Sequence, residues 1–239
     1  MNIFYILAVS LLIVFFFFYV SLAGEEDIKK PPIDKKVPDN LKTATFAMGC
    51  FWGPDVLFGG IEGVWKTRVG YAGGDKERPT YHSLGDHTET IQIDYNPEQI
   101  SYQELIEVFF ENHNPYVKPY STQYKSIVFY HNEKQKEIYE DYKEKITDNR
   151  TIYTELKPYE KFYYAEYYHQ KYRLQAYSIL MKEIRKYYEK DMNFINSTLA
   201  ARLNYFVGSR QGKKLFEKEK ELYGLDQKAL DWLEKFIKE

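Results

Sequence analysis

The chain has 239 residues, of which 44% are hydrophobic, and 33 Lys and Arg stand against 35 Asp and Glu, so its formal net charge is -2. This length predicts one main domain with short additions. The two signs of charge are interspersed, which argues against the basic stripe of a nucleic-acid-binding protein. A single cysteine excludes an intramolecular disulfide and a cysteine-based zinc site, and the five histidines show no ligand spacing, so we expect no metal.

The first residues are set apart from the rest of the chain. Residues 3–22 form an almost uninterrupted apolar run, about the length that crosses a bilayer as one helix. Small residues at 21–23 also offer a signal-peptidase site, although no Lys or Arg precedes the run. We interpret residues 1–23 as a transmembrane anchor or a signal peptide and expect a membrane-anchored or a secreted (periplasmic) protein. Residues 24–40 are charged and contain three prolines, which predicts an extended linker.

The main domain is expected over residues 41–188, with strands and helices in alternation. Alternation of polar and apolar residues predicts strands over residues 43–48 and 88–95, and residues 126–130 are predicted as a further short strand. Helices are predicted at Pro54 in a first turn, after Ser101 with Glu104 as a capping box, after Asn132 as a cap, and over a long Tyr-rich stretch from near Ala165. This order of elements predicts an α+β fold.

Residues 189–239 are expected to be a helical C-terminal extension. The segment is charged, Gly224 is expected to end a helix, and Asp226 can cap a final helix that runs to Glu239. Because long apolar runs are lost here, we interpret the extension as a solvated helical cover on the domain rather than as a separate interaction module.

Cys50 is the first candidate for chemistry. It follows a predicted strand and precedes a predicted helix, and the peptide dipoles and N–H groups at a helix N-terminus lower the pKa of a thiol. Gly49 and Gly53 leave room for a sharp turn. A lone cysteine is more often an inert core residue. The rings of Phe51 and Trp52, however, can form an apolar slot beside the sulfur, which favours a reactive thiol.

The segment Met48-Gly49-Cys50-Phe51-Trp52-Gly53 resembles the signature of the methionine sulfoxide reductase A family. The resemblance extends over about residues 43–172. Further matches follow in the family's order: Gly70-Tyr71-Ala72-Gly73-Gly74, Pro79-Thr80-Tyr81, Thr88-Glu89, Glu111-Asn112-His113, Gln123-Tyr124-Lys125-Ser126 and Tyr164-Ala165-Glu166 to His169-Gln170. The resemblance implies a mixed sheet with flanking helices, the ferredoxin-like core of this family.

The resemblance also implies a reaction and two of its residues. Cys50 matches the family's nucleophile, whose thiolate attacks the sulfoxide sulfur; the oxygen leaves the substrate, and the cysteine is left as a sulfenic acid. Glu89 matches the carboxylic acid that protonates the sulfoxide oxygen. The residues support Glu89 independently, because period-two alternation places it on the strand face of Ile91 and Ile93, where apolar surroundings favour the protonated form. The alternative is that Glu89 is an exposed carboxylate at the edge of the strand and has no catalytic role.

Four aromatic residues complete the site that the resemblance implies. Tyr81 and Tyr124 match tyrosines that hydrogen-bond the sulfoxide oxygen. Among 24 tyrosines, each would otherwise be assigned to packing. Phe51 and Trp52 match the pocket for the methyl group on sulfur, which selects the S-epimer.

The chain departs from the family pattern in two ways. Pro119 stands where familiar bacterial members have an Asp, and the family's acid after the signature is Asp55. The resolving cysteines of many members are missing, although residues around Asn196 and Ala200 resemble a branch without them. The resemblance then implies no organic cofactor and an external thiol reductant: thioredoxin, glutathione with glutaredoxin, or dithiothreitol.

The expected activity is therefore reduction of methionine-(S)-sulfoxide in peptides, and the free amino acid is left open as a second substrate. We expect the protein to be a monomer. The expected partners are oxidised proteins or methionine sulfoxide, a thioredoxin-like reductant, and the membrane if the N-terminal segment is uncleaved. Two alternatives are a thiol peroxidase, which needs only a reactive Cys50, and a non-catalytic module that binds oxidised methionine. Turnover with dithiothreitol distinguishes them.

Overall fold

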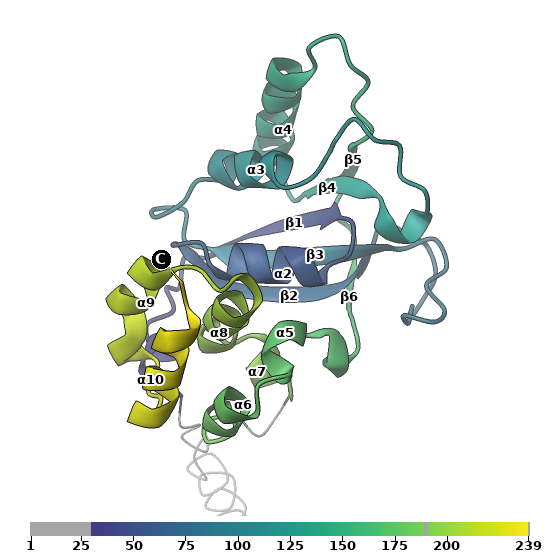
Figure 1. The fold of residues 1–239 in the computed structure, drawn as a ribbon. Coiled ribbons are helices and arrows are strands. Elements are labelled where there is room, and N and C mark those ends of the chain that lie inside the picture. Colours follow the sequence, from purple (N-terminus) through teal and green to yellow (C-terminus); the bar gives the residue numbers. More distant parts are fainter. Residues whose placement is uncertain (1–29, 189–190, 239) are drawn as a thin grey trace, which may run out of the picture.

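The computed structural model describes residues 30–188 and 191–238, so the apolar segment 1–23 lies outside the described residues. The central element is a six-stranded sheet in the order β5-β4-β1-β3-β2-β6 (Figure 1). Its strands are β1 (Lys42–Met48), β2 (Val64–Ala72), β3 (Thr88–Tyr95), β4 (Ser126–Tyr130), β5 (Glu155–Pro158) and β6 (Phe162–Tyr164). The β4–β5 pair is parallel and the other pairs are antiparallel, so the expected mixed sheet is confirmed.

Helices flank the sheet. The α-helices are α2 (Trp52–Gly59), α3 (Tyr102–Glu111), α4 (Glu133–Ile146), α5 (Tyr172–Gln175), α6 (Ser178–Ile184), α7 (Asp191–Ile195), α8 (Thr198–Ser209), α9 (Lys213–Glu219) and α10 (Gln227–Phe236). Short 3-10 helices are η1 (Pro32–Lys35), η2 (Thr122–Tyr124), η3 (Tyr167–His169) and η4 (Lys220–Leu222). In Figure 1, α3 and α4 lie beside the β4–β5 edge, and α5 to α10 lie toward the β2–β6 edge. Within the described ranges, no helix combines the length and the apolar character needed to span a membrane.

The main core joins α2 and α3 to one face of the sheet. Phe46 of β1 lies between Phe58 of α2 and Phe109 of α3, with ring centroids 5.8 and 5.1 Å away. Burying side chains of this size stabilises the fold by about 1.5–3 kcal/mol each. The predicted caps are present: the Ser101 and Glu104 capping box begins α3, and Asp226 accepts from the backbone of Ala229 at the start of α10. The ring contacts of Phe46 hold α2 and α3 against the same face of the sheet.

The long Tyr-rich helix predicted from near Ala165 is wrong. The chain pairs with β2 through β6, forms the 3-10 helix η3, and begins α5 only at Tyr172. Between them Lys171 has φ of 50°, in the left-handed region that side chains seldom adopt. A regular helix is broken here because tertiary bonds to Lys171 outweigh local propensity.

The C-terminal extension is also more than the solvated cover we expected. Its helices bury apolar residues in a second cluster that includes Leu203, Phe206 and Leu233, and this cluster takes Leu174 from before residue 189. These apolar residues are spaced along helices that are otherwise charged, so composition alone does not show that they form one apolar face. The proposed division at residues 188 and 189 is left as a prediction.

The part of the linker that the structure describes is docked rather than extended. Ile33 of η1 is buried in the second cluster. Asp34 accepts from the Thr198 backbone N–H at 2.6 Å and from the Ser197 hydroxyl at 2.8 Å, at the start of α8. An anion at a helix N-terminus is stabilised by the unpaired N–H groups there. The prolines predicted an extended linker, but they could not predict this docking, because the partners of Asp34 lie far along the chain.

Candidate active site

Cys50 lies at the turn from β1 into α2. Gly49 makes this turn with φ of +86°, a conformation that glycine adopts without strain, and a Cβ there would meet nothing within 4 Å. Cys50 is exposed to solvent. The backbone N–H of Trp52, at the start of α2, hydrogen-bonds the Cys50 sulfur. The predicted position at a helix N-terminus is therefore what the structure shows.

The pKa of Cys50 does not fall as we expected. Partial burial of the sulfur raises the pKa of the Cys50 thiol, and the charge of Glu89 adds to the rise. The Trp52 N–H and the Arg173 guanidinium act in the opposite direction but do not prevail. The neutral thiol is therefore favoured in the resting site.

Glu89 provides a buried carboxyl beside Cys50. It lies on β3 opposite Tyr71 of β2 and is 1% exposed. The backbone N–H of Phe51 donates to its Oε2 at 3.0 Å, and the Gln123 side-chain amide donates to its Oε1 at 2.7 Å. Burial raises the pKa of Glu89 although both hydrogen bonds oppose the rise. The expected protonation-prone carboxyl on an interior strand face is thus present.

The 3-10 helix η2 places Gln123 and Tyr124 over Glu89. The Thr88 hydroxyl fixes η2 to β3 by donating to the Thr122 carbonyl at 2.8 Å. Burial, the charge of Glu89 and a side-chain hydrogen bond with Tyr81 all raise the pKa of Tyr124. Tyr124 therefore stays a neutral hydrogen-bond donor.

Tyr81 is held by Glu166. The carboxylate of Glu166 accepts from the Tyr81 backbone N–H at 3.0 Å and from the Tyr71 hydroxyl at 2.8 Å. Burial would raise the pKa of Glu166, but these hydrogen bonds lower it below its ordinary value. The loop that carries Tyr81 is thereby fastened beside β2.

Trp52 lies between two rings from the segment after β6. Its ring stacks on Tyr172 with centroids 3.7 Å apart and an angle of 4°, and its indole N–H donates to His169 Nδ1 at 3.2 Å. Burial lowers the pKa of His169, so the neutral ring accepts this bond at Nδ1. Phe51 is 1% exposed and meets the same His169 ring edge-on at 5.1 Å. Phe51 therefore packs as part of the inner wall, and Trp52 presents the accessible apolar surface.

Comparison with known proteins decides what this arrangement is. A family model described as peptide methionine sulfoxide reductase matches residues 42–201. The chain belongs to that family. A peptide methionine sulfoxide reductase of Drosophila melanogaster is 42% identical over 187 residues, which cover 77% of this chain and 75% of that protein. Peptide methionine sulfoxide reductase A5 of Arabidopsis thaliana is 34% identical over 216 residues, 85% of this chain and 81% of that protein.

Solved structures agree with the peptide methionine sulfoxide reductase assignment. Mxr1 from Saccharomyces cerevisiae in reduced form matches with a TM-score of 0.51 and 30% identity over 62% of this chain and 88% of that chain. Methionine sulfoxide reductase A of Corynebacterium diphtheriae matches with a TM-score of 0.51 and 29% identity, over 64% of this chain and 90% of that one. The expected fold and enzyme class, an oxidoreductase that acts on sulfur groups, are confirmed at the level of the family.

The structure brings the predicted residues together and adds others that sequence reasoning left without a role. The additions are Gln123, Glu166, His169 and Tyr172. The first three fall inside segments that resemble the family, and that resemblance was the available signal. Pro119 is half-buried in the loop before η2, and the hydrogen bonds to Glu89 come from Gln123 and Phe51.

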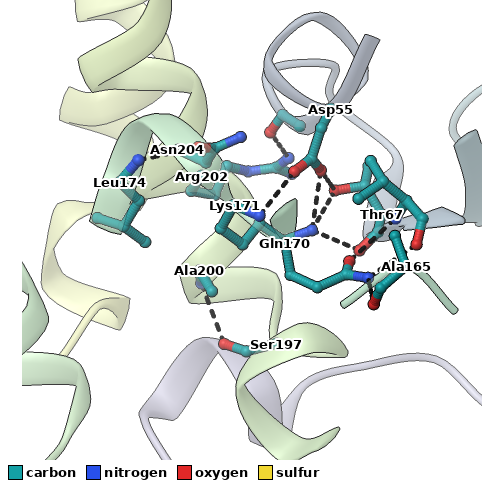
Figure 2. Close-up of polar contacts among 12 residues, drawn as sticks. Asp55, Thr67, Ala165, Gln170, Lys171, Leu174, Ser197, Ala200, Arg202 and Asn204 are labelled. Atoms are coloured by element: carbon teal, nitrogen blue, oxygen red, sulfur yellow. Dashed lines mark hydrogen bonds and ion pairs between the residues drawn. The ribbon is translucent and has the colours of Figure 1, made fainter. Parts of the chain in front are cut away.

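Asp55, which matches the acid after the family signature, does not face the open site. It is 1% exposed on the buried side of α2, where it pairs with Lys171 (Figure 2). No group of three or more His, Cys, Asp or Glu suited to a metal occurs among the described residues. A depression of about 360 Å³ lies elsewhere, between the ends of α3 and α4, and holds none of the predicted site residues. The predicted site residues therefore gather at the surface around Cys50.

Proposed function

We propose that this chain reduces methionine-(S)-sulfoxide in polypeptides, with Cys50 as nucleophile and Glu89 as general acid. The observation that carries the proposal is the exposed thiol of Cys50 beside a buried carboxyl, because burial raises the pKa of Glu89 and so favours the protonated form that a general acid needs. Family membership supports the substrate, and the site supports the roles.

The step balances as one two-electron transfer. The Cys50 sulfur attacks the sulfoxide sulfur, and Glu89 protonates the departing oxygen, since a bare oxide is a poor leaving group. The S–O bond of the substrate breaks, and Cys50 gains the hydroxyl as a sulfenic acid. The substrate sulfur is reduced by two electrons, the cysteine sulfur is oxidised by two, and the proton of the original thiol returns to Glu89.

Tyrosines contribute in two ways. Tyr81 and Tyr124 donate hydrogen bonds to the sulfoxide oxygen, where negative charge develops. At the rim, Tyr120 is 86% exposed and its ring lies 5.7 Å from that of Tyr124, while Tyr168 is 49% exposed beside His169. Exposed rings around a reactive centre favour contact with a polypeptide over contact with a free amino acid.

Regeneration of Cys50 requires an external thiol because the chain has one cysteine. A thioredoxin, glutathione with glutaredoxin, or dithiothreitol attacks the sulfenic acid to form a mixed disulfide and water. A second thiol then releases Cys50. The exposure of Cys50 supports this route, since the attacking sulfur must reach it in line.

The test is turnover of a synthetic peptide that carries one methionine sulfoxide, with dithiothreitol as reductant. The wild type should reduce the S-epimer and leave the R-epimer, and Cys50→Ser should release no methionine, because an alcohol is neither ionised nor nucleophilic enough. Peptide binding by Cys50→Ser shows that the variant is folded. Equal rates on both epimers, or residual turnover in Cys50→Ser, would overturn the proposal.

The same assay separates the alternatives. A non-catalytic binding module would hold the peptide without turnover in the wild type. A thiol peroxidase would consume an organic hydroperoxide much faster than the sulfoxide peptide, and would do so without Glu89. The proposed function requires the sulfoxide to be the better substrate by kcat/KM.

A further inference from the structure

A buried ion pair lies behind the catalytic surface. The Lys171 side chain is 0% exposed, and its Nζ donates to Asp55 Oδ1 at 2.9 Å, to the Thr67 hydroxyl at 2.8 Å and to the Thr67 carbonyl at 2.5 Å. The backbone N–H of Lys171 donates to Asp55 Oδ2 at 3.0 Å. The Thr67 hydroxyl in turn donates to Asp55 Oδ1 at 2.6 Å. Figure 2 shows these groups converging from α2, β2 and the segment before α5.

This pair is poorly explained as a device for stability alone. Two charges removed from water are stabilised by one another only enough to offset their desolvation, so hydrophobic residues of the same size would often serve the fold as well. Burial lowers the pKa of Lys171, and the Asp55 carboxylate opposes that shift. The pair does fix the relative position of the two residues, because both carboxylate oxygens of Asp55 and both nitrogens of Lys171 form hydrogen bonds.

The fixed geometry bears directly on Trp52. Asp55 lies in the first turn of α2, three positions after Trp52, and Lys171 lies between His169 and Tyr172, the two rings that hold the Trp52 indole. Lys171 has a left-handed backbone, and His169 before this turn and Tyr172 after it both contact the Trp52 ring. The bond from Lys171 N–H to Asp55 therefore joins the segment that carries the ring partners to the helix that carries Trp52.

We propose that Lys171 is a positioning residue that, through Asp55, sets the Trp52 ring and with it the shape of the substrate's methyl slot. The inference rests on the proposed function. It predicts that breaking the pair changes substrate fit and epimer choice rather than only the folded fraction. Lys171 touches no substrate in this arrangement and acts only through Asp55, His169 and Tyr172.

The test uses the full chain with Lys171→Met, which keeps the length of the side chain without its charge, and with the milder Thr67→Val, which removes the bridging hydroxyl. Both should raise KM for the S-sulfoxide peptide and lower the ratio of S- to R-epimer turnover, with kcat/KM falling about tenfold to a hundredfold, the usual effect of a misplaced binding group. The near-ultraviolet circular dichroism of the stacked Trp52 should weaken in step, with Trp52→Phe identifying its contribution.

Leu233→Ala, in the buried face of α10, is the matched control. It should lower the midpoint of urea unfolding while KM and the epimer ratio stay those of the wild type. If Lys171→Met and Thr67→Val behave like this control, or if their folded fractions keep the wild-type KM and epimer ratio, the positioning role is overturned. Failure of the wild type itself to reduce the peptide would instead overturn the proposed function, and the dichroism of Trp52 would still report on positioning.

Discussion

At the scale of single residues, the reaction needs Cys50 and Glu89 to hold one proton between them. Burial raises the pKa of both groups, and the charge of Glu89 adds to the rise for Cys50. The reactive combination, a thiolate with a protonated carboxyl, is one form of the singly protonated pair. Its share is constant between the two apparent pKa values of the pair and falls outside them.

This predicts different pH profiles for the wild type and Glu89→Gln. In the wild type, kcat/KM should fall at low pH, where both groups are protonated, and at high pH, where both are ionised. Glu89→Gln should be slower by about a hundredfold or more in the plateau, the contribution of a positioned general acid. Its rate should rise with pH and show no alkaline fall, because only the thiolate is then required.

The measurement is single-turnover release of methionine over the full pH range. Because the charge of Glu89 raises the pKa of Cys50, the rise in Glu89→Gln should end at a lower pH than the alkaline fall of the wild type. If Glu89→Gln kept the single-turnover rate of the wild type and only bound the peptide more weakly, Glu89 would be a pocket residue rather than the acid.

At the scale of elements, α8 connects the second cluster to the site. Asn204 of α8 accepts from the Leu174 backbone N–H at 3.1 Å, and Arg202 donates to the Gly59 carbonyl at the end of α2 at 2.7 Å. A buried backbone group without such a partner costs about 1–3 kcal/mol. The segment after His169 and the C-terminal end of α2 are therefore both hydrogen-bonded to α8 of the extension.

Removing the cap of α8 should destabilise this support. The Ser197 hydroxyl accepts from the Ala200 N–H at 3.0 Å and donates to Asp34, so Ser197→Ala should lower the free energy of unfolding by about 0.5–2 kcal/mol. Urea unfolding followed by far-ultraviolet circular dichroism measures it. Ser178→Ala, at an exposed first position of α6 whose cap Tyr177 makes no side-chain bond, is the control and should change little. Equal losses in the two variants would contradict the capping role.

At the scale of the whole molecule, one cysteine in 239 residues limits what a turnover can leave behind. A sulfoxide peptide without reductant should yield one equivalent of methionine and a Cys50 that carries one added oxygen. A sulfenic-acid trap such as dimedone should then add to Cys50 and to no other residue. Mass spectrometry of the intact chain reads both. A burst of two equivalents, or failure to trap an adduct, would rule out the one-cysteine route.

How far the sequence predicts this molecule depends on how local each signal is. The strand predicted from alternation over residues 88–95 and the short strand predicted over residues 126–130 have the bounds of β3 and β4, and the position of Glu89 follows from the alternation in the first. The roles of His169 and Lys171 could not be predicted, because each depends on a contact more than a hundred positions away, with Trp52 and Asp55. The pKa of Cys50 was predicted in the wrong direction because burial and a nearby anion are tertiary properties.

The docking of Asp34 on α8 has a consequence for biosynthesis. The bond between Asp34 and Thr198 closes a loop of 164 positions, and Ile33 enters a cluster built from residues that are translated far later. On the ribosome, the sheet and α2 can form while η1 still lacks its binding surface. Ile33 therefore lacks its buried position until α8 has been translated, and the second cluster forms at a pace set by closing a long loop. A chaperone that binds short apolar segments would meet this chain at η1.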